Sequence, residues 1–332
     1  MKKQEKIFVI GHKNPDTDSI CSAIAYCDIK NRTTQDSKYI AKRAGQINEE
    51  TEYVLNRFGV QPPGYLSNIG TQVKDMDIRL SPEANKSMSL KNAWDLMQEN
   101  SIVSLPIREK DGTLEGLITI GDIAKTYMDT TDSYLLSRAR TQYQRIAETI
   151  GGKVVEGNGH GYFIQGKIMV ATANPDKMKE YVEENDMIIM GNREEDHLQA
   201  IEQNVSCIIV GLGIEVTEKV LKLAHEKDII IISSPYDTFT ISRLINQSIP
   251  VKYIMKTESL VTFNTEDFTD DIQDVMIKHR HRAFPVIDKK GKCIGTISRR
   301  NFLDMHRKKV VLVDNNEKDQ AVDNIDKAEI ME

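Results

Sequence analysis

A long-range internal repeat constrains the fold of this chain more than any other feature of its sequence. Three motifs recur 178 or 179 residues further along, namely Val73-Lys74 as Val251-Lys252, Leu105-Pro106-Ile107 as Phe284-Pro285-Val286, and Gly116-Leu117-Ile118-Thr119 as Gly295-Thr296-Ile297-Ser298. The pattern of each copy predicts, in this order, a helix, a strand that contains the proline, a charged turn, a second strand and a second helix. Because one such unit cannot bury its apolar sheet face alone, we expect the two copies to pack together.

The residues between the two copies follow a pattern of their own. Within 130–248, predicted strands at 206–210 and 229–233 alternate with helices, which indicates a small α/β domain. The helices are expected at 135–150, 217–227 and 240–246. In the first copy, we interpret Trp94 as a core residue. The chain is therefore predicted to divide into segments 1–64, 65–129, 130–248, 249–308 and 309–332.

Composition narrows the class of function. The 332 residues carry a net charge of −6, which disfavours nucleic acid as a partner because nucleic-acid-binding domains usually show a basic surface. No apolar run approaches the ~20 residues of a membrane span, and the charged start 1–6 is unlike a signal peptide. The four cysteines form no CxxC pair. We expect a cytoplasmic protein with reduced thiols and no membrane contact.

The N-terminal segment contains residues suited to metal chemistry. A strand expected at 6–10 is followed by Gly11-His12-Lys13-Asn14-Pro15-Asp16-Thr17-Asp18-Ser19 and then by a helical pattern. Open α/β sheets bind ligands where the carboxyl end of a strand meets a helix in this way. The imidazole of His12 and the carboxylates of Asp16 and Asp18 suit divalent metals such as manganese or cobalt.

The local geometry of this loop can be anticipated in part. Asp16 and Asp18 point the same way if Thr17 points inward. Asp18 or Ser19 is expected to cap the following helix, whose free N–H groups attract phosphate oxygens. A turn and helix cap without a metal is the alternative interpretation.

The nine-residue motif resembles the signature of the family II inorganic pyrophosphatases, which are manganese- or cobalt-dependent phosphoesterases with an Asp-His-His motif. Segments 20–26, 43–51 and 311–314 match the same family. The resemblance implies an α/β fold in which a doubly wound parallel sheet is interrupted by an insert. That insert is a pair of cystathionine-β-synthase-type (CBS) repeats flanking a domain similar to the DRTGG type, typical of the nucleotide-regulated subclass.

The resemblance also implies an activity and a ligand set. The activity is two-metal hydrolysis of pyrophosphate to two phosphates with Mn²⁺ or Co²⁺, with Mg²⁺ as a further candidate. The implied metal ligands are His12, Asp16, Asp18 and Asp314. A phosphoesterase of the Asp-His-His type acting on nucleotides is an alternative, although Thr17 and Ser19 favour pyrophosphate over polymeric substrates.

Two departures from the family pattern affect the expected activity. Asn315 stands where the family has a histidine, and an amide cannot serve as an imidazole ligand or proton carrier. The Asp-His-His motif and the domain that grips the substrate are absent from the 332 residues. We therefore expect a C-terminally truncated chain that is inactive alone, with its catalytic residues unknown. A regulatory module that senses AMP or ADP without catalysis is the alternative function.

Resemblance to CBS pairs predicts an adenine nucleotide (AMP, ADP or ATP) in the cleft between the repeats. The pattern Gly-x-x-[Ser/Thr]-x-x-[Asp/Asn] occurs once in each copy. Its hydroxyl can hold a phosphate at a helix N-terminus, and Asp122 is better suited than Asn301 to accept ribose hydroxyls. The expected nucleotide-binding residues are Thr119, Asp122, Lys256, Thr257, Arg280, Ser298 and Asn301. Simple helix capping is the alternative role for the two motifs.

A basic cluster accompanies the second copy. Residues 278–282, with Arg299 and Arg300, could neutralise nucleotide phosphates. They could equally complement the end of a helix. Because CBS pairs commonly dimerise, we also expect a homodimer formed through the insert.

Overall fold

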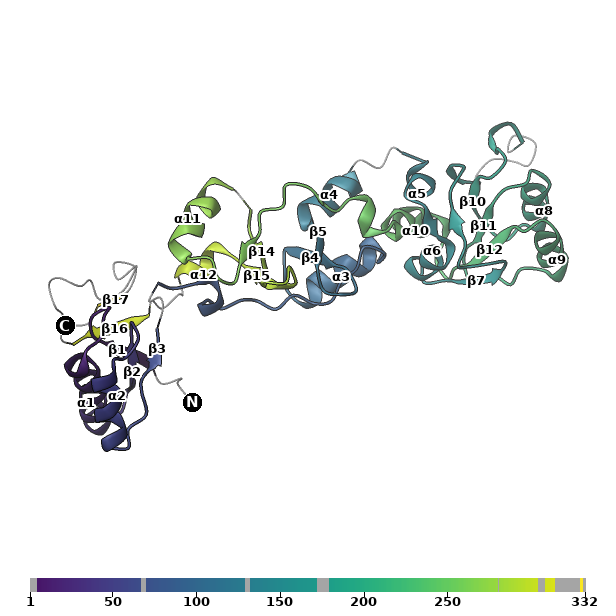
Figure 1. Ribbon diagram of the computed structural model, residues 1–332. Helices are drawn as coiled ribbons and strands as arrows, with labels where there is room; N and C mark the ends of the chain where they lie inside the picture. Colours follow the sequence, from purple (N-terminus) through teal and green to yellow (C-terminus); the bar gives the residue numbers. More distant parts are fainter. Residues whose placement is uncertain are drawn as a thin grey trace. The chain divides into compact units, whose positions relative to one another are not determined.

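The computed structural model describes residues 5–66, 70–128, 132–171, 179–279, 281–303, 308–313 and 329–330. Figure 1 shows a series of small α/β modules along the chain. Residue contacts divide the chain into two units. The first unit comprises 1–79, 262–290 and 294–332, and the second comprises 80–261 and 291–293.

The N-terminal module of the first unit is a five-stranded parallel sheet, in the order β17-β16-β1-β2-β3. Its central strand buries Ile7, Val9 and Ile10. Buried Ala23 and Cys27 of α1 pack on one face of this sheet, as expected for an α/β fold. The elements are β1 (Glu5–Ile10), α1 (Thr17–Thr33), β2 (Ser37–Arg43), α2 (Glu49–Arg57), β3 (Gly64–Tyr65), β16 (Lys309–Leu312) and β17 (Glu329–Ile330).

The two copies of the repeat have the predicted element order. The first copy, in the second unit, comprises α3 (Leu90–Glu99), β4 (Ser104–Arg108), β5 (Leu114–Thr119) and α4 (Ile120–Met128). The second comprises β13 (Phe263–Asn264), α11 (Thr269–Lys278), β14 (Phe284–Ile287), β15 (Cys293–Ile297) and α12 (Arg299–Leu303). Both proline-containing strands, β4 and β14, are almost completely buried.

The segment that precedes each copy in sequence pairs with the other copy. Arg79 bridges to Thr296 within the first unit, and Lys256 bridges to Leu117 within the second. These approaches require the repeated glycines. A Cβ atom on Gly116 would lie 2.9 Å from the Lys256 carbonyl oxygen, and one on Gly295 would overlap the Arg79 carbonyl oxygen. The boundaries of the two sequence copies therefore differ from the boundaries of the two units, because each unit includes the segment that precedes the other copy.

The inserted domain contains the sheet β7-β12-β11-β10-β9, in which β9 to β12 run parallel and β7 is antiparallel. Strands β10 and β11 are fully buried, so they read as continuous apolar runs. The elements are β7 (Lys153–Glu156), β9 (Ile168–Val170), β10 (Met187–Met190), α8 (Glu194–Glu202), β11 (Cys207–Val210), α9 (Glu218–Glu226), β12 (Ile230–Ser233) and α10 (Thr238–Leu244).

The helix predicted at 135–150 was wrong. The structure has α5 (Leu135–Arg138), β6 (Thr141–Gln142) and α6 (Tyr143–Thr149) in its place. Arg140 has a φ angle of 51°, which ends the helix. The two residues that follow pair with β8 (Tyr162–Phe163), so a contact that is distant in sequence overrides the local helical pattern.

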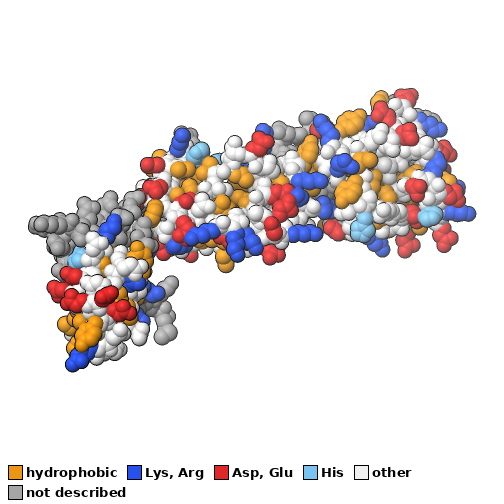
Figure 2. Space-filling view, viewed as in Figure 1, with side chains coloured by type: hydrophobic (Ala, Val, Ile, Leu, Met, Phe, Trp, Pro, Cys, Tyr) orange, Lys and Arg blue, Asp and Glu red, His pale blue; other side chains and the backbone are white. Residues whose placement is uncertain are grey.

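Two general findings bear on the class of protein. All four cysteines are free thiols. Within the ranges that the structure describes, no helix has both the length and the apolar character needed to cross a bilayer. On the face shown in Figure 2, acidic and basic side chains are interspersed.

Candidate metal loop and nucleotide-binding residues

The loop after β1 lies beside the end of β16. The two strands are parallel with Ile10 opposite Leu312, and the Val313 N–H donates to the Ile10 carbonyl at 2.9 Å. A Cβ atom on Gly11 would overlap Ser19 Oγ and lie 3.3 Å from the Val313 carbonyl oxygen. The residue before Asp314 therefore contacts the strand end that leads to His12. Asp314 itself, like Asn315, lies outside the described residues.

His12 and Asp16 come together at the start of α1. His12 Nε2 lies 3.5 Å from Asp16 Oδ1, with the imidazole buried and the carboxylate more than half exposed. Asp16 is the N-cap of α1 and accepts from the Ser19 N–H at 2.9 Å. The prediction that Asp18 or Ser19 caps this helix was therefore wrong, because α1 begins at Thr17.

Asp18 lies in the first turn of α1, where its Oδ1 accepts from Ser22 Oγ at 3.2 Å. Thr17 Oγ1 lies 3.1 Å from Thr51 Oγ1 of α2. Strand-like alternation therefore does not determine how Asp16 and Asp18 point, because Thr17 and Asp18 already belong to the helix.

The donor set suits a divalent transition metal but is incomplete in the described part of the chain. An imidazole and exposed carboxylates from one loop are ligands that Mn²⁺ and Co²⁺ accept. Among the described residues, no three His, Cys, Asp or Glu side chains gather closely enough to hold a metal ion. A complete site therefore needs a donor from elsewhere, and the position after Val313 is the nearest predicted one.

Sequence reasoning did not identify the residues that support the loop from β2. A Cβ atom on Gly45 would overlap the Lys13 carbonyl oxygen and lie 2.7 Å from Pro15 Cδ. Arg43 Nη1 donates to the Gly45 carbonyl at 2.6 Å, and Arg43 Nε donates to the Pro63 carbonyl at 3.0 Å. Arg43 thus ties the support of the loop to the segment where the chain leaves the N-terminal sheet.

Three predicted nucleotide-binding residues gather at the start of α4. Asp122 accepts from the Thr119 N–H at 2.9 Å and from Thr119 Oγ1 at 2.6 Å. Lys256 Nζ lies 3.5 Å from Asp122 Oδ1, and the exposed Thr257 follows in sequence. A hydroxyl, a carboxylate and an ammonium group therefore lie together at a helix N-terminus.

The second copy repeats this arrangement with an amide. Asn301 Oδ1 accepts from the Ser298 N–H and from Ser298 Oγ, both at 2.7 Å. Asn301 Nδ2 also donates to the Asp77 carbonyl at 2.7 Å. Both motifs cap their helices, as the alternative interpretation required. Arg280 lies outside the described residues.

One residue of the basic cluster, Arg299, forms hydrogen bonds with backbone carbonyl groups at the end of a helix. Arg299 Nη2 donates to the carbonyl oxygens of Met276 and His279, at 2.6 and 3.0 Å, where α11 ends. Carbonyl groups at the C-terminus of a helix lack intrahelical partners in general, so a guanidinium group placed there stabilises them. For Arg299, the structure favours the helix-end role.

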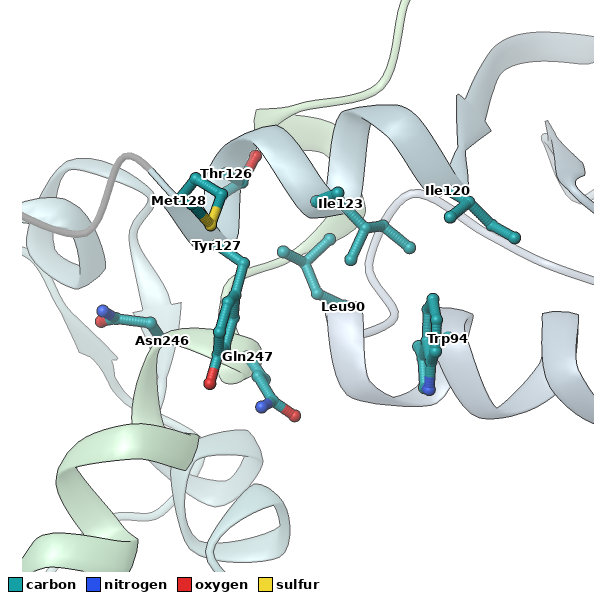
Figure 3. A pocket seen from close by; sticks show the side chains of 10 residues that line it. Leu90, Trp94, Ile120, Ile123, Thr126, Tyr127, Met128, Asn246 and Gln247 are labelled. Atoms are coloured by element: carbon teal, nitrogen blue, oxygen red, sulfur yellow. The ribbon is translucent and has the colours of Figure 1, made fainter.

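An apolar pocket of about 350 Å³ lies in the second unit, between α3, α4 and the turn that follows α10. Ile120, Ile123 and Tyr127 face it from α4, and Trp94 faces it from α3 (Figure 3). Trp94 is 38% exposed. The interpretation of Trp94 as a core residue was therefore wrong, because helical spacing alone cannot tell which apolar face another element covers.

Comparison with known proteins assigns the modules. Residues 77–129 and 251–308 match the CBS domain, and residues 145–248 match the DRTGG domain. The solved CBS and DRTGG domains from the regulatory region of Clostridium perfringens pyrophosphatase are 33% identical to this chain, with a TM-score of 0.65. The match covers all of that structure and 69% of this chain. This chain belongs to the family II inorganic pyrophosphatases that carry CBS and DRTGG domains.

Relatives in this pyrophosphatase family match almost the whole chain. The cobalt-dependent inorganic pyrophosphatase of Clostridium perfringens is 37% identical over 99% of the chain. A probable manganese-dependent inorganic pyrophosphatase of Thermotoga maritima is 30% identical over all of it. The chain spans 60% of the length of each of these two proteins. The predicted family and α/β fold class are confirmed.

Proposed function

We propose that this protein is part of a metal-dependent inorganic pyrophosphatase whose activity is regulated by adenine nucleotides, and that the 332 residues alone do not hydrolyse pyrophosphate. The observation that carries the proposal is the pairing of β1 with β16, which brings the His12–Asp16 loop beside the residue that precedes Asp314. Relatives named as cobalt- and manganese-dependent pyrophosphatases support the same reaction. The proposed metal ligands are His12, Asp16, Asp18 and Asp314, with Mn²⁺ or Co²⁺ as the preferred ion and Mg²⁺ as a substitute.

Each part of the loop has a role in this chemistry. A bound divalent ion would lower the pKa of a water molecule and neutralise charge on the leaving phosphate. His12 and Asp16 would hold that ion from one side, and the α1 N-terminus would favour phosphate oxygens nearby. Asp16 would do this while capping α1, so one side chain would both position the helix and bind the ion.

The metal assignment is tested with Asp16→Asn. Asparagine caps helices as well as aspartate does, so the substitution should leave α1 intact while removing the anionic ligand. We expect Mn²⁺ affinity, measured from the electron paramagnetic resonance signal of free Mn²⁺, to fall by at least about tenfold. Asp28→Asn, on an exposed face of α1, is the control and should bind Mn²⁺ normally. Equal Mn²⁺ affinity for wild type and Asp16→Asn would reject the assignment.

For regulation, we propose that the CBS pair binds AMP, ADP or ATP through Thr119, Asp122, Lys256, Thr257, Arg280, Ser298 and Asn301. The related Clostridium perfringens regulatory region was solved with the activator diadenosine tetraphosphate. We expect calorimetry to detect AMP and ADP binding to the 332-residue chain. We expect no phosphate release from pyrophosphate with Mn²⁺, because its sequence contains no Asp-His-His motif. Turnover would contradict that expectation, and absence of both binding and turnover would contradict the regulated-enzyme proposal.

The nucleotide site can be separated from helix capping by Asp122→Asn. Asn301 caps α12 in the second copy, so an asparagine at 122 should keep the cap. It would remove the charge that faces Lys256 and that would hold the ribose, so AMP affinity should fall by about tenfold. The control is Asp237→Asn, because Asp237 is the N-cap of α10 and accepts from the Thr240 N–H and hydroxyl. Loss of AMP binding in both variants would indicate a purely structural role.

We also propose that the protein forms a homodimer through the second unit. The α3–α4 face carries an apolar pocket and exposes Trp94, Tyr127 and Met128, the last to 80%. Sedimentation equilibrium should give twice the 37.7 kDa chain mass, and Met128→Lys should shift the mass toward one chain. A monomeric wild type would refute this. A cytoplasmic location is proposed from the four free thiols and is checked by cell fractionation.

A further inference from the structure

Two connections join the N-terminal sheet to the rest of the chain, and Lys308 of one connection contacts the other. The chain leaves the sheet after β3 and returns to it at Lys308, the residue before β16. Lys308 Nζ lies 2.9 Å from Asp75 Oδ2 and donates to the Gly70 carbonyl at 3.2 Å. A side chain on the returning connection therefore holds the outgoing one at two points.

The contact is shielded from solvent. The side chains of Lys308 and Asp75 are only 19% and 29% exposed, so salt screens their attraction less than that of a surface pair. Asp75 also accepts from the Gln72 N–H at 3.0 Å, which fixes its carboxylate at the end of the short 3₁₀ helix η1 (Val73–Asp75). The partner of Lys308 is thus held in place by its own turn.

The turn that holds Asp75 is itself bonded to the second CBS repeat. The Val73 N–H donates to the Asp267 carbonyl at 2.9 Å, and the Lys74 N–H donates to the Thr265 carbonyl at 3.0 Å. A displacement of residues 265–267 would therefore carry η1 with it. Since η1 holds Lys308, the displacement would reach β16, whose last residue precedes Val313 and Asp314.

We propose that Lys308 is a positioning residue that couples nucleotide binding in the CBS pair to β16 and so to the metal loop. This rests on the proposed function. The coupling runs from the second repeat through η1 and Asp75 to Lys308, and then along β16 to the strand end beside Ile10. Repacking in the repeat would change how β16 pairs with β1, and metal binding would in turn alter nucleotide affinity by the same factor.

The coupling is tested by amide hydrogen exchange on the 332-residue chain. ADP is added at a concentration that calorimetry shows to be saturating for each variant. We expect ADP to change exchange in residues 309–312 by at least about fivefold in the wild type. Lys308→Met should bind ADP within about twofold of wild type but lose this change, whereas Lys308→Arg should retain it.

Two further variants test whether the effect is specific to the contact between Lys308 and Asp75. Asp75→Asn keeps the acceptor for the Gln72 N–H but removes the charge that faces Lys308, so it should behave as Lys308→Met does. Lys289→Met, which removes an exposed cation of the same repeat 3.9 Å from Glu266, should behave as wild type. Failure of the wild type to bind ADP would overturn both the proposed function and the coupling. ADP binding with no exchange change in 309–312, or with an equal change in Lys308→Met, would overturn the coupling alone.

Discussion

Asp186→Ala is expected to lose about 3 kcal/mol of unfolding free energy. Asp186 is fully buried at the start of β10. Its carboxylate accepts from the backbone N–H groups of Lys167 and Glu183, each at 2.9 Å, and lies 2.9 Å from Lys167 Nζ. Truncation would leave two backbone donors and a mostly buried ammonium group without their shared partner.

The charge state of the pair supports this expectation. Burial of Lys167 opposes its charged form, but bonds from Asp186 and Glu183 outweigh burial and raise the pKa of Lys167. A raised folded-state pKa means that Lys167 is protonated at neutral pH and that its contribution to stability is then fully present. The contribution is lost only as pH rises through the folded-state pKa. The measurement can therefore be made at neutral pH.

Urea unfolding followed by tryptophan fluorescence measures the effect. Trp94 is the only tryptophan in the chain and belongs to the same unit as Asp186, so its signal reports that unit. Glu183→Ala is the matched control. The Glu183 carboxylate is 71% exposed and also pairs with Lys167, so its removal should cost less than about 1 kcal/mol. Equal losses for the two variants would show that burial is not the cause.

Gly11→Ala should have the second large effect, on both stability and metal binding. Its new Cβ atom would overlap Ser19 Oγ and lie 2.9 Å from Ser19 Cβ, and Ser19 is only 1% exposed. The side chain of Ser19 cannot turn away into solvent, so the loop or α1 must move. We expect a loss of about 1–3 kcal/mol and a fall in Mn²⁺ affinity of more than about tenfold.

A second-site change tests the steric cause. Gly11→Ala combined with Ser19→Gly removes the overlap and leaves the Val313 carbonyl oxygen, at 3.3 Å, as the closest remaining atom. Mn²⁺ affinity should recover to within about threefold of wild type, although glycine in α1 costs about 1 kcal/mol. Gly191→Ala, where a Cβ atom would meet nothing within 4 Å, should match the wild type. Amide exchange in β1 and α1 reports stability, and a double variant no better than Gly11→Ala would exclude the overlap as the cause.

Local patterns in the sequence were sufficient to predict much of the fold. The apolar runs of β11 and β12 and the proline-containing strands β4 and β14 have the period and length that burial requires, whereas β10 was not predicted. The strand–loop–helix order around His12 and Asp16 was also predictable, because it depends on neighbouring residues. The N-cap was misplaced by two or more residues, since Asp16, Asp18 and Ser19 are all good caps and only the start of α1 distinguishes them.

Elements whose form depends on distant contacts were not predictable. Residues 135–150 have a helical pattern, yet pairing of β6 with β8 interrupts it at Arg140. Trp94 has the spacing of a core residue, yet in the described chain it lines an open pocket. The pairing of the segment before each repeat with the other repeat was also not predicted. Gly116 and Gly295, which this pairing requires, did recur in the sequence.

The sequence by itself determined most of the helices and strands and the family that the chain belongs to, because these follow from local periodicity and from short motifs. It also proposed side chains for a metal ion and for a nucleotide. Only the tertiary structure decided that β16 lies beside β1, that Lys256 joins Asp122, and that Lys308 holds Asp75. These contacts join segments that are far apart along the chain. The energy that selects them comes from packing and charge burial in the folded state, which no window of sequence contains.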